Sequence, residues 1–173
     1  MKTLIVYSTL TGNTQKVAEA IQEVFEVQAD LAPVEDNPSA EGYDLILVGF
    51  WVDKGMADKK SKEYLSSLRH KKVGLFATLG AYPDSDHARQ TMIQSSQLLD
   101  SSNQLTGTFI CQGKVDPRLT AMYKQFPEGH PHAMTPERIA RLQEAAKHPN
   151  EADFTKAKAV FAEVRRQLLA GEI

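Results

Sequence analysis

The residues best suited to chemistry stand together near the start of the chain, as Ser8-Thr9-Leu10-Thr11-Gly12-Asn13-Thr14. They follow an apolar segment typical of a strand and precede an amphipathic segment typical of a helix. A turn of this kind directs several unpaired backbone N–H groups and the positive end of the helix dipole at one point, which favours an anion. Hydroxyls and the Asn13 amide add neutral donors, and Gly12 permits close approach. The stretch therefore predicts a phosphate site without Lys or Arg.

Two other nucleotide motifs are absent from this position. A P-loop needs Gly-x-x-x-x-Gly-Lys-Ser/Thr and a dinucleotide fold needs Gly-x-Gly-x-x-Gly, and neither pattern occurs here. The remaining alternative is that the Ser, Thr and Asn side chains simply cap the helix. Seven consecutive residues of this composition directly after the first strand favour the phosphate site.

Other reactive side chains give weaker indications. His130, His132 and His148 invite a metal hypothesis, but Pro131 holds the first two in extended geometry, and we interpret them as solvated loop histidines. Cys111, the only cysteine, lies in an apolar run that predicts a buried structural thiol and excludes an internal disulfide.

A polar stretch, Asp84-Ser85-Asp86-His87, opens a predicted helix. We expect its carboxylates to cap that helix, with His87 a minor candidate for a proton donor. No serine stands in a Gly-x-Ser-x-Gly elbow, so nothing here predicts nucleophilic catalysis.

The elements that must position the phosphate loop alternate along the chain. Apolar runs predict strands at about 2–7, 27–32, 44–50, 73–79 and 105–111, and amphipathic patterns predict helices that start near Asn13, span about 57–69, and run from Asp84 or Asp86 to Leu99. Such alternation is typical of βαβ units and a parallel sheet with helices on both faces, hence an α/β fold.

The rest of the chain is predicted to be helical. Asp116-Pro117 can open a short helix that carries Leu119, Met122 and Phe126, and Thr135-Pro136 can open a second with Ile139 and Leu142. Asn150 is a candidate N-cap, with Asp153 three residues on. The final helix should bury an apolar stripe: Phe154, Ala157, Val160, Phe161, Val164 and Leu168. Nothing marks a second domain, so we expect residues 1–173 to form one.

The sequence resembles the flavodoxin family. The stretch from Ser8 to Thr14 matches the Ser/Thr-x-Thr-Gly-x-Thr phosphate loop of that family, with Thr9 on its first Thr, and the element order over about 1–111 matches its fold. The resemblance implies a five-stranded parallel sheet of order 2-1-3-4-5, extra C-terminal helices, and FMN as the cofactor. The backbone N–H groups of 9–14 and the hydroxyls of Thr9, Thr11 and Thr14 are then expected to bind the FMN phosphate.

The same resemblance implies that the loops after the third and fourth strands flank the flavin. Trp51 would cover one face and Tyr82 the other face or its edge, with main-chain groups of 50–55 and 79–82 at the pyrimidine. The alternative is that these aromatic residues only pack over the end of the sheet and contact no ligand. The expected cofactor-binding residues are Ser8, Thr9, Leu10, Thr11, Gly12, Asn13, Thr14, Phe50, Trp51, Val52, Asp53, Lys54, Gly55, Leu79, Gly80, Ala81 and Tyr82.

Composition and charge bound the function. A net charge of −2 argues against a nucleic-acid binder, and no apolar stretch approaches a membrane span, so we expect a cytoplasmic protein. Residues 1–52 are acidic and residues 53–72 basic, a pattern that solvated helix faces explain better than a docking surface does. Three hypotheses stay open: an electron-transfer protein with a redox partner protein, a small FMN-dependent NAD(P)H or quinone reductase, and a non-redox partner-binding module.

Overall fold

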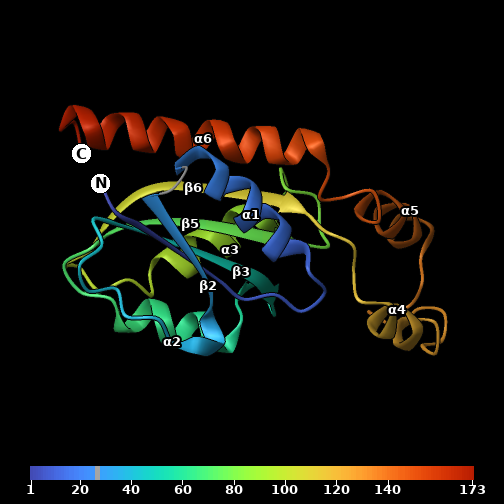
Figure 1. Cartoon of the computed structure of the whole chain (residues 1–173). Helices are drawn as coiled ribbons and strands as arrows, with labels where there is room; N and C mark the ends of the chain where they lie inside the picture. The colour runs from blue at the N-terminus through green and yellow to red at the C-terminus, as the bar shows by residue number, and fades with distance from the viewer. Residues whose placement is uncertain (26–27) are drawn as a thin grey trace.

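The computed structural model describes residues 1–25 and 28–173. In these residues five parallel strands follow the order β2-β1-β3-β5-β6 (Figure 1). The strands are β1 (Thr3–Tyr7), β2 (Ala29–Pro33), β3 (Leu45–Asp53), β5 (Lys72–Leu79) and β6 (Gln104–Gln112). A short β4 (Met56–Ala57) pairs antiparallel with β3. The predicted α/β sheet of order 2-1-3-4-5 is confirmed, and residue 27 of the predicted second strand lies outside the described residues.

Helices cover both faces of the sheet. On one face α1 (Asn13–Phe25) and α6 (Glu151–Ala170) pack over a core that includes Ile5 and Phe76. On the other, α2 (Lys59–Ser67) and α3 (Asp86–Ser96) pack over residues that include Val48 and Leu75. These strand segments are continuously buried because both faces are covered, as expected for a parallel sheet. A 3-10 turn, η2 (Val34–Asp36), follows β2.

The third parallel strand is longer than predicted and ends in a hairpin. It continues to Asp53, and Val52 and Asp53 pair with Ala57 and Met56 of β4. The two residues between the strands, Lys54 and Gly55, have φ values of 49° and 81°. Positive φ at both positions is the signature of the tight turn whose twist suits a hairpin. The expected loop over 50–55 is therefore strand and turn.

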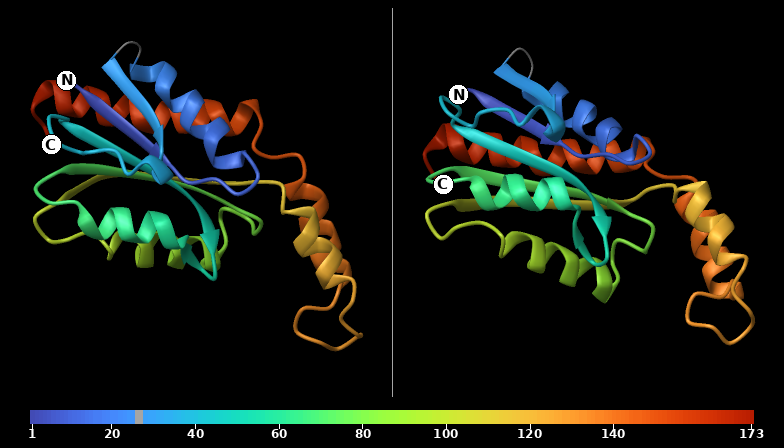
Figure 2. Two further views of the ribbon diagram at one scale, coloured as in Figure 1. Left: turned by 60° about the horizontal axis from the view of Figure 1, so that its bottom comes forward. Right: turned by 90° about the horizontal axis from the view of Figure 1, so that it is seen from below.

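Two short helices, α4 (Pro117–Tyr123) and α5 (Pro136–Ala145), lie beyond the carboxyl end of the sheet as a projecting arm, defined as residues 113–149 (Figures 1 and 2). Both helix starts were predicted, and the side chains of Asp116 and Thr135 cap them. The arm is thinly packed, since Ala145 is the one residue of these two helices that is buried.

The last helix returns along the sheet. Its predicted start is confirmed, because the Asn150 side chain accepts from the N–H groups of Ala152 and Asp153 while Asp153 accepts from the Asn150 N–H. Phe161 is fully buried and meets Phe76 edge to face, with ring centroids 6.2 Å apart. The helix thus anchors the end of the chain on the sheet.

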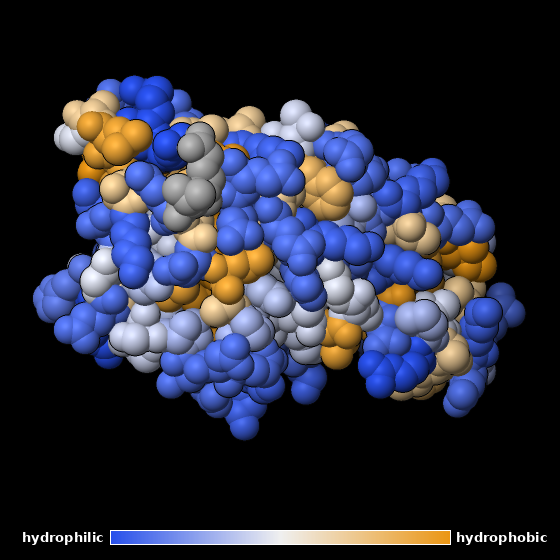
Figure 3. Space-filling model, in the orientation of Figure 1, coloured by the Kyte–Doolittle hydropathy of each residue, from blue (hydrophilic) through white to orange (hydrophobic). Residues whose placement is uncertain are grey.

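Hydrophilic residues cover most of the face drawn in Figure 3, and apolar residues surface there in separate small patches. In the part of the chain that the structure describes, no helix combines the length and the apolar character needed to cross a membrane.

Candidate functional site

A cavity of about 490 Å³ opens at the carboxyl ends of β1, β3 and β5. Its size falls within the range of small-molecule pockets, roughly 300–1,000 Å³. Its walls come from the ends of β3 and β5, the loops after β1 and β5, the start of α3 and the arm. The lining residues are Thr9, Leu10, Thr11, Asn13, Thr14, Trp51, Val52, Thr78, Leu79, Gly80, Ala81, Tyr82, Ser85, His87, Gly113, Lys114, Val115, Asp116, Leu119, Tyr123, Arg141 and Leu142.

The loop from Ser8 to Thr14 wraps the N-terminus of α1. Gly12 has a φ of 85°, and its carbonyl accepts the first helical bond from the Lys16 N–H at 3.2 Å. The Gly12 N–H donates to the Thr9 hydroxyl at 2.9 Å, which closes the turn. The N–H groups of 9–11 and 13–14 have no acceptor within 1–25 and 28–173. The loop therefore presents open donors at a helix N-terminus, where an anion binds best.

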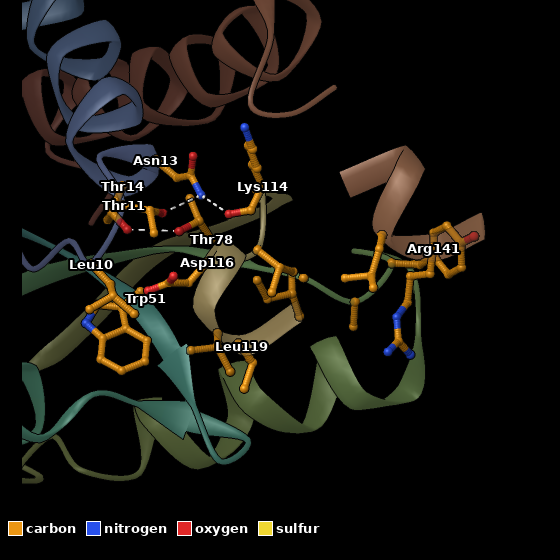
Figure 4. A pocket seen from close by; sticks show the side chains of 18 of the residues that line it. Leu10, Thr11, Asn13, Thr14, Trp51, Thr78, Lys114, Asp116, Leu119 and Arg141 are labelled. Atoms are coloured by element: carbon orange, nitrogen blue, oxygen red, sulfur yellow. Dashed lines mark hydrogen bonds between the residues drawn. The ribbon is translucent and has the colours of Figure 1, made fainter. Parts of the chain in front are cut away.

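Two side chains fix this loop to its surroundings. The hydroxyls of Thr14 and Thr78 lie 2.9 Å apart in a buried contact that joins α1 to β5. The Asn13 amide nitrogen donates to the Thr11 hydroxyl at 3.0 Å and to the Lys114 carbonyl at 2.9 Å (Figure 4). Both amide hydrogens of Asn13 are thus used within the protein, so this side chain holds the loop to the arm.

The cavity also contains the two predicted aromatic residues. Trp51 is half-buried near the end of β3, in register with Thr78, and Tyr82 follows β5 with 42% of its surface exposed. Leu79, Gly80 and Ala81 line the cavity beside Tyr82. Most of the residues expected from the loops after β1, β3 and β5 are therefore brought to one site.

Some expected site residues lie elsewhere. Phe50 is fully buried among core residues, because neighbouring side chains on a strand point to opposite faces and Trp51 takes the cavity side. Ser8 is buried and its N–H bonds the Gly49 carbonyl. The remaining residues outside the cavity lining are Gly12, Asp53, Lys54 and Gly55. The last three belong to the hairpin that β4 creates.

The arm supplies a wall of the cavity through residues that were not among the expected site residues. The wall consists of residues from α4, from α5 and from the segment between β6 and α4: Val115, Leu119, Tyr123, Arg141 and Leu142. The motifs Asp116-Pro117 and Thr135-Pro136 predicted both helices, but no local pattern told where the arm would lie. Leu119, which remains 37% exposed, faces the cavity and not a core.

The two charged side chains that the arm places at this end of the cavity, Asp116 and Arg141, differ in their hydrogen bonding. Asp116 accepts two contacts from the Arg118 Nε, at 3.0 and 3.1 Å, and these hydrogen bonds hold the pKa of its carboxyl below the usual range. Arg141 differs, because its Nε is buried and has no hydrogen-bond partner among the described residues.

The remaining candidates have structural roles. Cys111 is buried, and burial raises the pKa of its thiol, so a reactive thiolate is disfavoured. The rings of His130 and Phe126 stack with their centroids 4.2 Å apart, and those of His132 and Tyr123 stack with their centroids 6.0 Å apart.

The expected capping by Asp84 or Asp86 is wrong. The hydroxyl of Ser85 accepts from the Ala88 N–H, because Ser85 occupies the N-cap position and Asp86 already lies in the first helical turn. Next to this helix start, His87 lines the cavity.

Comparison with known proteins gives consistent matches. The flavodoxin domain model matches residues 4–162. A flavodoxin-like domain-containing protein BilS from Clostridioides difficile is 33% identical over 162 residues, covering 91% of this chain and 92% of the relative. A BilS protein from Clostridium symbiosum is 28% identical over 175 residues, with coverages of 89% and 90%.

Solved structures share the fold at low identity. Oxidised flavodoxin 2 from Bacillus cereus superposes with a TM-score of 0.58 at 18% identity, covering 96% of this chain and 99% of the other. A flavoprotein in complex with FMN from Lactobacillus acidophilus superposes with a TM-score of 0.51 at 20% identity, covering 63% of this chain and 92% of the other. Rubredoxin oxygen:oxidoreductase from Desulfovibrio gigas superposes with a TM-score of 0.53 at 14% identity, covering 96% of this chain and 37% of that enzyme.

Proposed function

Because the chain belongs to the flavodoxin domain family, we propose that it binds FMN non-covalently and transfers electrons to or from a partner oxidoreductase. The observation that most strongly supports this proposal is that one cavity is lined by the loop after β1, with its unpaired N–H groups, and by Trp51 and Tyr82. Bound FMN supplies the redox chemistry, and the protein supplies binding, orientation and electrostatics.

The loop is suited to hold the FMN phosphate. Its open N–H groups and the helix dipole offer positive potential without a formal charge, and the hydroxyl of Thr11 stands at the exposed side of the loop. No lysine or arginine belongs to the loop itself. The phosphate is therefore held by oriented dipoles, which are already fixed by the Thr9–Gly12 and Thr14–Thr78 contacts.

The two aromatic residues are suited to hold the ring system. The backbone of Trp51 is fixed by its strand pairing with Thr78, so the indole starts from a defined position beside the cavity. Tyr82 lies on a loop and keeps much of its surface in solvent. In this arrangement Trp51 supplies the rigid face, and Tyr82 supplies a face or edge that remains accessible. Residues 79–82 line the same cavity, and their main-chain groups are proposed to hold the pyrimidine end of the ring.

Electron exchange with a protein partner takes place at the open side of the cavity. Leu10 and Tyr82 flank that side with 49% and 42% of their surfaces exposed. Apolar groups of this kind give close contact without the desolvation cost of charges. The partner is therefore expected to approach between the loop after β1 and the loop after β5.

One observation favours a second function, a small FMN-dependent NAD(P)H or quinone reductase. The cavity continues past the two flavin loops to a wall made by the arm, which leaves room for a substrate beside the ring. In that case the chain would itself react with a small molecule and would need no separate reductase.

The test uses the full chain reconstituted with FMN. NADPH and NADH oxidation are followed with cytochrome c as acceptor, first alone and then with an added NADPH-dependent flavodoxin reductase. A slow direct rate that rises strongly with the reductase supports the carrier, and a fast direct rate supports the reductase alternative. A colourless protein that takes up no FMN contradicts both and leaves the partner-binding module.

A further inference from the structure

The arm carries three arginines whose surroundings differ in one respect. Arg118 is paired with Asp116, with its Nη2 2.6 Å from a carboxylate oxygen. Arg138 stacks over the ring of Tyr123 at 4.9 Å and donates to two carbonyl groups of the loop before α5. Arg141, one turn further along α5, has a buried Nε without a partner in the described part of the chain.

Arg141 also differs in where it lies. It lines the cavity, whereas neither Arg118 nor Arg138 does. Figure 4 shows it at the end of the cavity opposite Thr11 and Trp51, with Leu119 between them. In the same view the Lys114 side chain points away from Leu119, so its ammonium group does not serve this end. Arg141 is therefore the cation at this end of the cavity.

The other side chains at this end of the cavity are apolar, except for Asp116, whose charge is paired with Arg118. Val115, Leu119, Tyr123 and Leu142 supply the surface around Arg141. Asp116 is the carboxylate of the lining, and Arg118 already satisfies it. No hydrogen bond or salt bridge of Arg141 occurs among the described residues, and because its Nε is buried, its terminal Nη groups are the donors that an anion in the cavity would meet. A guanidinium matches a carboxylate in two parallel hydrogen bonds.

We propose that this end of the cavity is a second binding subsite, next to the FMN site, for an organic carboxylate with a flat apolar body. Arg141 holds the carboxylate, and Leu119, Tyr123 and Leu142 pack against the body. The proposal rests on the proposed function, because FMN is taken to fill the part of the cavity between the phosphate loop and the two flavin loops.

The test measures binding of naphthalene-2-carboxylate to the FMN-loaded chain by titration calorimetry, with neutral naphthalene-2-methanol as the matched probe. Arg141→Gln should weaken carboxylate binding about 10- to 100-fold, as expected for loss of charge-assisted hydrogen bonds. It should leave the weak binding of the alcohol unchanged. Arg165→Gln is the control, since the Arg165 Nε is also buried and unpartnered, but the residue lies on α6 outside the cavity lining.

The outcomes separate this subsite from the flavin site. Carboxylate binding that Arg141→Gln leaves unchanged, or that displaces FMN from the loaded protein, overturns the subsite while FMN binding stands. A loss of FMN affinity in Arg141→Gln also overturns it, because Arg141 would then belong to the flavin site. A chain that takes up no FMN contradicts the proposed function and the subsite together. Unchanged thermal unfolding of the variants shows that they remain folded.

Discussion

The hydroxyl oxygens of Thr14 and Thr78 lie 2.9 Å apart, and both residues are almost completely buried. This contact joins the first turn of α1 to the end of β5, so it fixes the phosphate loop against the strand that leads to Tyr82. Two separately predicted parts of the site are thus held by one hydrogen bond.

Thr14→Val should lower the free energy of unfolding by about 1–3 kcal/mol, because the Thr78 hydroxyl then remains buried without its partner. The double variant Thr14→Val/Thr78→Val should recover much of this loss, since no unpaired hydroxyl is left. Urea unfolding of the two single variants and the double variant measures the coupling. Strictly additive losses would show that the contact contributes nothing of its own.

Trp51→Ala should weaken the binding of FMN and riboflavin alike, by about 10-fold or more, because a stacked face of the ring is lost. Trp51→Phe, which keeps an aromatic face, should retain most of the affinity. Flavin fluorescence titration measures all three proteins. If Trp51→Ala binds both flavins as tightly as the parent, the ring does not lie on Trp51.

Phe161→Ala should destabilise the chain by about 3–5 kcal/mol, because it empties a fully buried site against Phe76 and Gly74. Leu169→Ala on the same helix is the control, since Leu169 is 64% exposed and surface changes of this kind stay within about 0.5 kcal/mol. Equal losses in chemical unfolding would mean that α6 does not pack on the sheet as described.

His148 links the arm to α6. Its Nδ1 lies 2.5 Å from the Asp153 carboxylate, and this hydrogen bond raises the pKa of the imidazole above its ordinary value. A raised pKa means that the folded state holds the proton more tightly than the unfolded chain does. The stabilisation is complete below the unfolded pKa of about 6.5 and is lost as the pH rises through the folded value.

The free energy of unfolding of the parent and of His148→Gln should therefore differ most near pH 5.5, with the difference shrinking as the pH rises past the raised pKa of His148. Urea titrations at a series of pH values give the two curves. A difference that stays constant with pH would show that the interaction of His148 with Asp153 does not depend on its charge.

Local signals were sufficient for the sheet and for the position of the loop from Ser8 to Thr14. The strands are apolar runs covered on both faces, and this loop is a continuous polar stretch between a strand and a helix. The same holds for the capping box of Asn150 and Asp153. Each of these features depends on residues that are neighbours in the sequence.

Two features escaped prediction for different reasons. The β3–β4 hairpin is local, but it depends on the positive φ of Lys54 and Gly55, which makes part of the expected flavin loop strand and turn. The arm wall arises from where α4 and α5 lie relative to the sheet. Leu119 and Ile139 were recognised as apolar residues of these helices, but they remain partly exposed, so their pattern did not indicate what the helices pack against.

The measurement that tests the central claim most directly compares the affinities of FMN and riboflavin for the parent chain, Thr11→Val and the surface control Thr155→Val. If the loop from Ser8 to Thr14 holds the phosphate, the parent binds FMN more tightly than riboflavin. Thr11→Val then weakens FMN by about 10-fold while leaving riboflavin unchanged, and Thr155→Val changes neither. Equal affinity of the parent for both flavins, or an equal loss of both in Thr11→Val, would contradict the assignment of this loop.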